Sequence, residues 1–116
     1  MKVKYRIRIK IRDFFNNIKW KYQRAKRGYS EYDLWEIDYW FINTFSRMLR
    51  DFVKINHGYP SDKETPENWE KEILHNADLL EQLEIDLYDY DRIDEIEKNR
   101  DEFFEWLKNN LWNLWD

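Results

Sequence analysis

The chain of 116 residues has no cysteine, two glycines and two prolines. Without cysteine, a disulfide framework, a thiolate metal site and a thiol nucleophile are excluded, and the composition suits a reducing cytoplasm. Because Gly and Pro are the main breakers of regular structure, their scarcity favours a few long helices over a many-stranded sheet. No apolar run approaches the roughly twenty residues of a membrane span, so no membrane partner is expected. The basic start lacks a following apolar segment, so no secretory signal is expected either.

Aromatic side chains are abundant, with seven Trp, eight Tyr and seven Phe. The mean hydropathy of −1.01 is typical of disorder, but that scale scores Trp and Tyr as polar. Disordered chains are poor in aromatics, so we expect a folded protein. The length suits one domain, which we place over residues 1–116.

Charge divides the chain unevenly. Residues 1–27 carry eleven Lys or Arg and a single acid, Asp13, whereas residues 28–116 carry nine basic residues and twenty-three acidic ones. We therefore distinguish a basic helix or arm, 1–27, from an acidic helical body, 28–116. Such a division either attracts an anionic partner or holds the basic and acidic parts of the chain together.

The first segment supports two structural interpretations. Between Lys2 and Arg12 basic and apolar residues alternate, which is typical of a strand. Apolar residues also recur every three or four positions, which predicts a helix continuing to Gly28. These positions are Ile7, Ile11, Phe14 or Phe15, Ile18, Tyr22 and Ala25. We predict a helix over about 10–27 that packs through this stripe, with residues 1–9 either helical or extended.

Turn and capping signals divide the rest of the chain. Ser30 can cap a long second helix ending at Asn56 to Gly58, and Asp33 occupies the acidic position of a capping box. The predicted buried face of this second helix comprises Leu34, Ile37, Phe41, Phe45 or Thr44, Met48, Phe52 and Ile55.

Thr65 before Pro66 predicts the start of a third helix. Its apolar stripe comprises Trp69, Ile73, Ala77, Leu80 and Leu83. We place a loop or kink near 86–92 and a last helix after it. Its apolar side comprises Ile93, Ile96, Phe103 or Phe104, Leu107, Leu111 and Leu114. The predicted fold is all-α, a compact single-domain bundle of about four helices.

Catalytic and metal-binding patterns are weak. His57 and His75 lack metal-ligand spacing, and the acids of residues 85–95 lack the glycine of a calcium loop. Glu67 and Glu70 form the ExxE half of a magnesium site like that of all-α nucleotide pyrophosphohydrolases, but no convincing ExxD lies opposite. We expect no catalytic residue, metal or cofactor.

A mixture of cations and flat aromatic rings is the stronger signal. Guanidinium groups bind phosphates and aromatic faces stack on bases, so such a set can hold a nucleotide. The predicted ligand-binding residues are Arg24, Arg27, Tyr29, Trp35 and Tyr59, with Lys26, Trp40 and His57 as neighbours in the same set. A structural role for the tryptophans, with the cations solvating a helix end, is the alternative.

The run RAKRGYSEYDLWEIDYWF, the later GYP and Trp69, and the terminal LWNLWD resemble a family of small phage and prophage proteins of unknown function. The resemblance covers about residues 24–83 and the last few residues. It implies a phage context, and hence the cytoplasm of a host cell, without naming a reaction.

These features lead to one function hypothesis with two alternatives. The first is a non-enzymatic phage accessory binding protein that antagonises a host defence or regulatory component, either by sequestering a nucleotide signal or by masking a host protein. The alternatives are a nucleic-acid-binding protein that uses the basic arm, and a magnesium-dependent nucleotide pyrophosphohydrolase. The composition is compatible with a homo-oligomer. Membrane binding ranks last, because cations at the even positions of a helix leave no broad apolar face.

Overall fold

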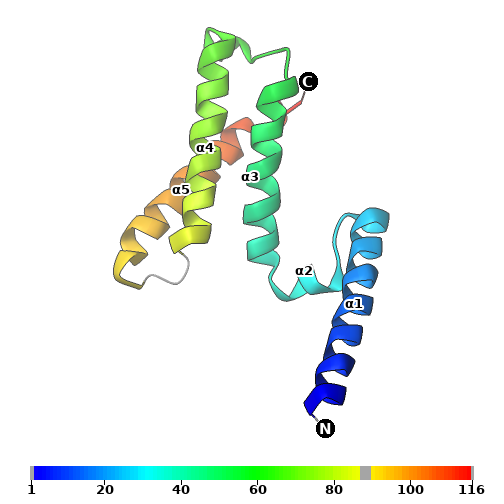
Figure 1. Cartoon of the computed structure of the whole chain (residues 1–116). Helices are drawn as coiled ribbons and strands as arrows, with labels where there is room; N and C mark the ends of the chain where they lie inside the picture. The colour runs from blue at the N-terminus through cyan, green and yellow to red at the C-terminus, as the bar shows by residue number, and fades with distance from the viewer. Residues whose placement is uncertain (1, 87–89, 116) are drawn as a thin grey trace. The chain divides into compact units, whose positions relative to one another are not determined.

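The structure, a computed structural model, describes residues 2–86 and 90–115, with the backbone alone for residue 2 and residues 84–86. This part of the chain is all-α and contains no strand, which confirms the predicted fold class (Figure 1). Its elements are α1 (Lys2–Arg27), α2 (Glu31–Trp35), α3 (Ile37–Ile55), η1 (Ser61–Lys63), α4 (Pro66–Asp86), η2 (Tyr90–Arg92), α5 (Ile93–Asn110) and η3 (Leu111–Asn113), where η is a 3₁₀ turn. No helix in these ranges is long and apolar enough to cross a membrane.

The chain divides into two units, residues 1–38 and residues 39–116, called unit 1 and unit 2 below. Unit 1 carries eleven basic and five acidic residues, and unit 2 carries nine basic and nineteen acidic residues. The predicted charge boundary after residue 27 therefore falls inside unit 1. The assignment of residues 1–116 to a single domain stays a prediction.

The first helix is continuous from its start. Residues 2–9 are helical, so the extended alternative for this segment is wrong. Lys and Arg are good helix formers, and no Gly or Pro interrupts the run until Gly28. Gly28 takes φ +87°, and its N–H donates to the Arg24 carbonyl oxygen at 2.9 Å. This left-handed residue ends α1, as the sequence predicts.

The predicted long second helix is interrupted at Glu36. The backbone of Glu36 takes φ −140° and ψ 62°, outside the helical region. The Glu36 N–H donates to the Asp33 carbonyl oxygen at 3.2 Å, which closes α2 as a short turn. The prediction of one helix from the Ser30 cap to Asn56 is therefore wrong, and α3 begins anew at Ile37. The capping box of Ser30 and Asp33 is confirmed.

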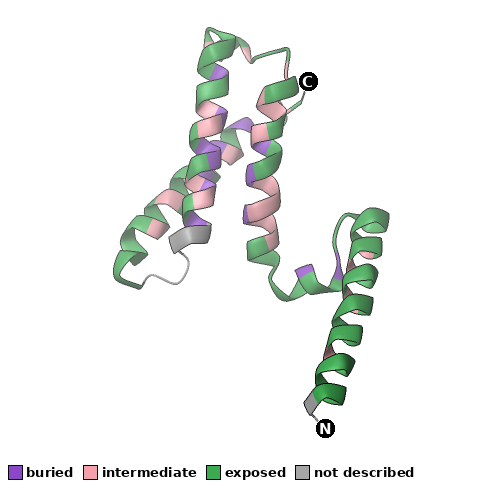
Figure 2. Ribbon diagram, viewed as in Figure 1, coloured by how far each residue is buried: buried purple, intermediate pink, exposed green. Residues whose placement is uncertain are grey.

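The core of unit 2 lies between α3, α4 and α5, as the buried positions in Figure 2 show. The predicted stripe of the third helix is confirmed, since Trp69, Ile73, Ala77, Leu80 and Leu83 are all buried. Rings join the helices: Phe45 meets Phe103 edge-on at 6.0 Å, and Trp69 lies 6.2 Å from Trp106. Each large apolar side chain buried here contributes roughly 1.5–3 kcal/mol relative to exposure.

The buried face of α3 agrees only in part with the predicted one: Phe41, Phe45 and Phe52 pack against the core as predicted. Four expected core positions are at least half exposed, namely Leu34, Ile37, Met48 and Ile55. Ile42 and Leu49, which the prediction missed, are buried instead. The prediction carried one helical phase through residue 36, whereas the break there resets it. On the last helix the prediction missed Trp106, which is buried, while Ile93 and Leu111 are exposed.

The connections follow the capping signals closely. The Thr65 hydroxyl oxygen accepts the Asn68 N–H at 3.1 Å, and Pro66 is the first residue of α4. The predicted loop or kink near 86–92 is bounded by α4, which extends to Asp86, and by the 3₁₀ turn Tyr90–Arg92. Residues 87–89 of that prediction lie outside the described residues.

Candidate functional site

A half-buried ion pair organises the turn between α1 and α2. Arg24 donates to both carboxylate oxygens of Asp33, from Nε at 3.0 Å and from Nη2 at 2.8 Å. The backbone N–H of Ser30 and its hydroxyl also donate to Asp33 Oδ2, at 2.8 Å and 3.0 Å. Ser30 is fully buried and Asp33 is nearly so. One carboxylate therefore joins the last turn of α1 to the cap of α2.

The electrostatics of this turn keep the pair ionised. The hydrogen-bonded guanidinium of Arg24 and, after it, the hydrogen bonds from Ser30 together lower the pKa of Asp33 to about 2, against the opposing effect of burial. The same hydrogen bond to Asp33 raises the pKa of Arg24. Both groups are therefore charged at every physiological pH. Arg24 acts as a structural cation here, with its charge already matched.

The next arginine is also engaged. Arg27 Nε donates to the Tyr29 carbonyl oxygen at 3.0 Å, and its guanidinium lies 4.6 Å from the centre of the Tyr29 ring. This is a cation–π contact. Lys19 pairs with Glu31 at 2.9 Å, and that ion pair lowers the pKa of Glu31. Three cations of α1 are thus used within the turn.

Three aromatic rings pack together beside this turn, and we call Trp20, Tyr32 and Trp35 the aromatic trio. Trp35 lies edge-on to Trp20 at 6.3 Å and to Tyr32 at 5.7 Å, and Tyr32 lies 5.0 Å from Trp20. Trp20 is half-buried, whereas Trp35 keeps 72% of its surface exposed. Sequence reasoning selected Trp35 and missed Trp20. The available signal was helical spacing, since Trp20 lies one turn before Arg24.

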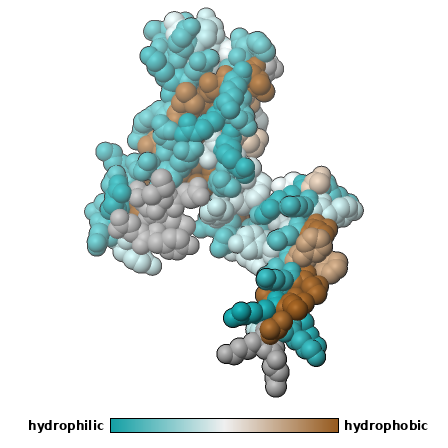
Figure 3. Space-filling model, viewed as in Figure 1, coloured by the Kyte–Doolittle hydropathy of each residue, from teal (hydrophilic) through white to brown (hydrophobic). Residues whose placement is uncertain are grey.

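The predicted apolar stripe of α1 lies on the other side of the helix. Its larger members, from Ile7 to Tyr22, are 49% to 64% exposed, and Figure 3 shows a hydrophobic band along α1. Val3, 69% exposed, was not part of the prediction but extends the same face, and we call the combined set the outer stripe, namely Val3, Ile7, Ile11, Phe14, Phe15, Ile18 and Tyr22. The half-buried side chains of α1 are instead Ile9, Asn16, Trp20 and Gln23. The expected packing of the stripe is therefore not found among the described residues of unit 1.

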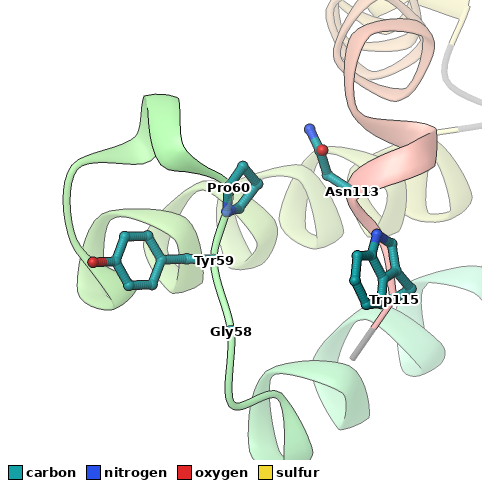
Figure 4. A pocket seen from close by; sticks show the side chains of 5 residues that line it. All are labelled: Gly58, Tyr59, Pro60, Asn113 and Trp115. Carbon is teal, nitrogen blue, oxygen red and sulfur yellow. The ribbon is translucent and has the colours of Figure 1, made fainter.

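Unit 2 contains a separate small pocket of about 190 Å³. Its lining residues are Gly58, Tyr59, Pro60, Asn113 and Trp115, all uncharged. Figure 4 shows Asn113 and Trp115 facing the 58–60 loop, whereas the Tyr59 ring extends to the other side of that loop. A pocket without charged lining residues can hold a flat apolar group, but it offers a phosphate no counter-charge.

The five predicted ligand-binding residues are thus distributed over both units. Arg24, Arg27 and Tyr29 meet at the turn after α1, and Trp35 belongs to the trio at the end of α2. Tyr59 lies in unit 2, beside its pocket. Their role in binding a ligand stays a prediction.

A metal-binding group is not found in the described residues. Within those ranges no three His, Asp or Glu side chains are grouped so that they could hold a metal ion. Glu67 and Glu70 are exposed near the start of α4, where acids favour the helix dipole. His75 lies 3.0 Å from Glu102 in an exposed pair. The pyrophosphohydrolase alternative therefore has no geometric support in these ranges.

Unit 2 also holds a half-buried ionic network beside its core. Lys63 Nζ lies 2.9 Å from Glu72 Oε1, which also accepts the Trp106 ring N–H at 2.8 Å. Lys63 lies 5.3 Å from the centre of the Trp69 ring. These contacts tie η1 to α4 and α5. Their partners are satisfied within the fold, so we assign the network a structural role.

Comparison with protein-family models, curated proteins and solved structures gives no match.

Proposed function

We propose that this protein is a non-enzymatic accessory binding protein of phage type that masks a host protein, and that the aromatic trio of unit 1 forms the binding surface. The observation that carries the proposal is Trp35, which is 72% exposed although two neighbouring rings hold it in place. The phage context rests on the sequence resemblance. The compartment is then the cytoplasm of the host cell.

An exposed and ordered tryptophan has the properties of an interface hot spot. Trp and Tyr dominate the binding energy of protein interfaces because they bury a large area at a small cost in side-chain entropy. The ion pair of Arg24 with Asp33 fixes the backbone that carries Tyr32 and Trp35. Binding by a surface ordered in advance costs less entropy than binding by a mobile one.

The contacts of the arginines favour masking a protein over sequestering a nucleotide. A nucleotide site needs cations that can turn to a phosphate, yet Arg24 is held by Asp33 and Arg27 by the Tyr29 carbonyl oxygen. The exposed part of the trio is aromatic, which suits an apolar protein surface. We therefore propose a protein partner, and no nucleotide, metal or cofactor.

Photo-crosslinking tests this proposal. A benzoylphenylalanine replaces Tyr32 in one variant and Tyr90 of unit 2, 79% exposed, in a matched control. In bacterial cells we expect the probe at position 32 to give a defined adduct with a host protein, and the probe at position 90 to give none. A second substitution, Trp35→Ala, is expected to reduce the adduct at least tenfold. Identical adducts from both positions, or adducts that do not depend on Trp35, would contradict the proposal.

Titration calorimetry separates masking from sequestration. With cyclic and linear nucleotides we expect no heat of binding from the purified protein. Heat that disappears with Arg27→Ala would show that a nucleotide displaces the Tyr29 contact. That result would replace masking by sequestration.

A further inference from the structure

The outer stripe of α1 gives the helix a second surface, opposite the trio. Its seven apolar side chains extend from Val3 to Tyr22, about 30 Å at 1.5 Å per residue. At about 100° per residue they fall within an arc of about 120°, wide enough to be one continuous face. Trp20 and Ile9 project from the opposite side, where Trp20 meets α2. Binding through one face therefore leaves the other accessible.

Cations follow both edges of this face. On the helical wheel Lys10 and Lys21 lie along one edge, and Arg8 and Lys26 lie along the other, where Lys19 is already paired with Glu31. Lys26 Nζ lies 5.9 Å from the centre of the Tyr22 ring, so a cation directly borders the stripe. Such side chains can lay their apolar stems beside a hydrophobic surface and extend their charges away from it.

This arrangement corrects the reason for setting membrane binding aside. That reason is the expectation that cations at even positions fall all round the helix and leave no broad apolar face. In α1 the arc of the outer stripe contains only Lys4, with Lys21 at its border, because most cations project elsewhere. The helix cannot span a membrane, but an amphipathic basic helix can lie in the surface of one.

We propose that α1 lies on an anionic phospholipid surface, with the outer stripe among the acyl chains near the headgroups and the bordering cations at the lipid phosphates. Charge complementarity identifies this occupant. Cations border the stripe on both sides and along its length, and an anionic membrane presents negative charge evenly on all sides. The proposal goes beyond the proposed function and uses a different face of α1.

The other occupants fit this charge pattern less well. A second copy of α1 would bring like charges together along both edges, which opposes pairing. A nucleic acid would match the cations but leave Ile7, Ile11 and Ile18 against a polar backbone. A protein groove would need acidic side chains on both rims over about 30 Å. An anionic lipid surface places negative phosphates on both sides of any helix that lies in it.

Co-sedimentation of the purified full chain with large unilamellar vesicles tests the proposal. We expect at least tenfold stronger binding to vesicles of equal phosphatidylcholine and phosphatidylglycerol than to pure phosphatidylcholine. The double substitution Ile11→Ser and Ile18→Ser is expected to reduce this binding at least tenfold. Met48→Ser is the matched control, because Met48 is equally apolar, 60% exposed and located in unit 2. It is expected to bind as the unsubstituted chain does.

A charge variant keeps the test decisive if the serine substitutions disturb α1. Lys10→Gln with Lys26→Gln retains the apolar face, and we expect weaker binding to anionic vesicles and a shallower dependence on salt. The absence of vesicle binding, equal binding to neutral and anionic vesicles, or indifference to the serine substitutions would overturn the proposal. So would a concentration-dependent dimer, or binding to duplex DNA, that the same substitutions abolish without any vesicle binding. Photo-crosslinking from position 32 is unaffected by these outcomes, so failure here leaves the proposed function standing.

Discussion

Replacing Arg24 by Gln removes the cation that holds Asp33 at the turn of unit 1. The carboxylate loses two hydrogen bonds, at 3.0 Å and 2.8 Å, and keeps those from Ser30. Arg24 is the largest cause of the lowered pKa of Asp33, which changes from an ordinary 3.8 to about 2. At 1.36 kcal/mol for each pH unit, that difference corresponds to about 2 kcal/mol. The Arg24 side chain is 48% exposed, so solvent screening lowers the expected loss to about 1 kcal/mol.

The pH dependence follows from the sign of the change. A carboxyl group whose pKa is lower in the folded chain stabilises the fold at every pH above its ordinary value, and this contribution is lost as the pH falls through the folded value. The original chain and the Arg24→Gln variant should therefore differ fully at pH 7. Their difference should shrink between about pH 4 and pH 2.

Carbon-detected NMR titration of the Asp33 carboxyl measures this directly. We expect a pKa of about 2 in the original chain and a value closer to the ordinary 3.8 in Arg24→Gln. Amide hydrogen exchange of residues 28–36 should become faster in the variant at pH 7. Arg12→Gln is the control, because the contact between Arg12 and Asp13, at 3.7 Å, is an exposed one. If the pKa of Asp33 stays near 2 without Arg24, or if the control changes it equally, the ion-pair account is wrong.

Three further substitutions test the fold. Ile73 lies in the core and is 0% exposed, so Ile73→Ala should lower the free energy of unfolding by about 2–5 kcal/mol in urea titrations. A loss below about 1 kcal/mol would show that the site is not close-packed. Glu72→Gln should cost about 1–3 kcal/mol in the same assay, because Lys63 loses the closer of two carboxylates, at 2.9 Å, and keeps only the longer contact with Asp62 at 3.8 Å. An unchanged midpoint would show that the network is not formed. Gly28→Ala should cost about 1 kcal/mol through backbone strain at φ +87° alone, because an added Cβ meets no atom beyond the adjoining residues within 4 Å. Faster amide exchange at the end of α1 is the expected signature, and unchanged exchange would contradict it.

Local signals predicted the helix boundaries well where one side chain decides them. The oxygen of Thr65 caps α4 and Pro66 begins it, and the stripe from Trp69 to Leu83 is the buried face of that helix. Capping depends on neighbours within four residues, so the sequence contains the whole interaction. The same holds for Ser30 and Asp33.

Interactions between distant residues could not be predicted in this way. Neither Gly nor Pro marks the break at Glu36, so the prediction extends a single helical phase through it and misses Ile42 and Leu49 on the buried face of α3. The stripe of α1 was expected to pack because such stripes usually face a core. In unit 1 the other complete helix is α2, only five residues long, and its Tyr32 and Trp35 meet α1 on the side of Trp20.

The sequence predicts the residue types of the candidate site, but it does not show which of these side chains are already bonded within the fold. Arg24 and Arg27 were selected because guanidinium groups bind phosphates. Their partners became visible only in the folded chain, where Asp33, nine residues beyond Arg24, approaches it across the turn. The charge pattern of the sequence places Arg24 in the basic segment and Asp33 in the acidic one, although the two form one ion pair.

The central claim is that the exposed Trp35 surface binds a host protein. Quantitative affinity capture from host extract with three baits tests it most directly: the original chain, Trp35→Ala, and Trp112→Ala as the matched control, since Trp112 is 84% exposed in unit 2. A hot-spot tryptophan contributes about 2 kcal/mol or more, or roughly thirtyfold in affinity. We predict a host protein retained by the original chain and the control and reduced at least tenfold with Trp35→Ala. A captured set that Trp35→Ala leaves unchanged would contradict the claim.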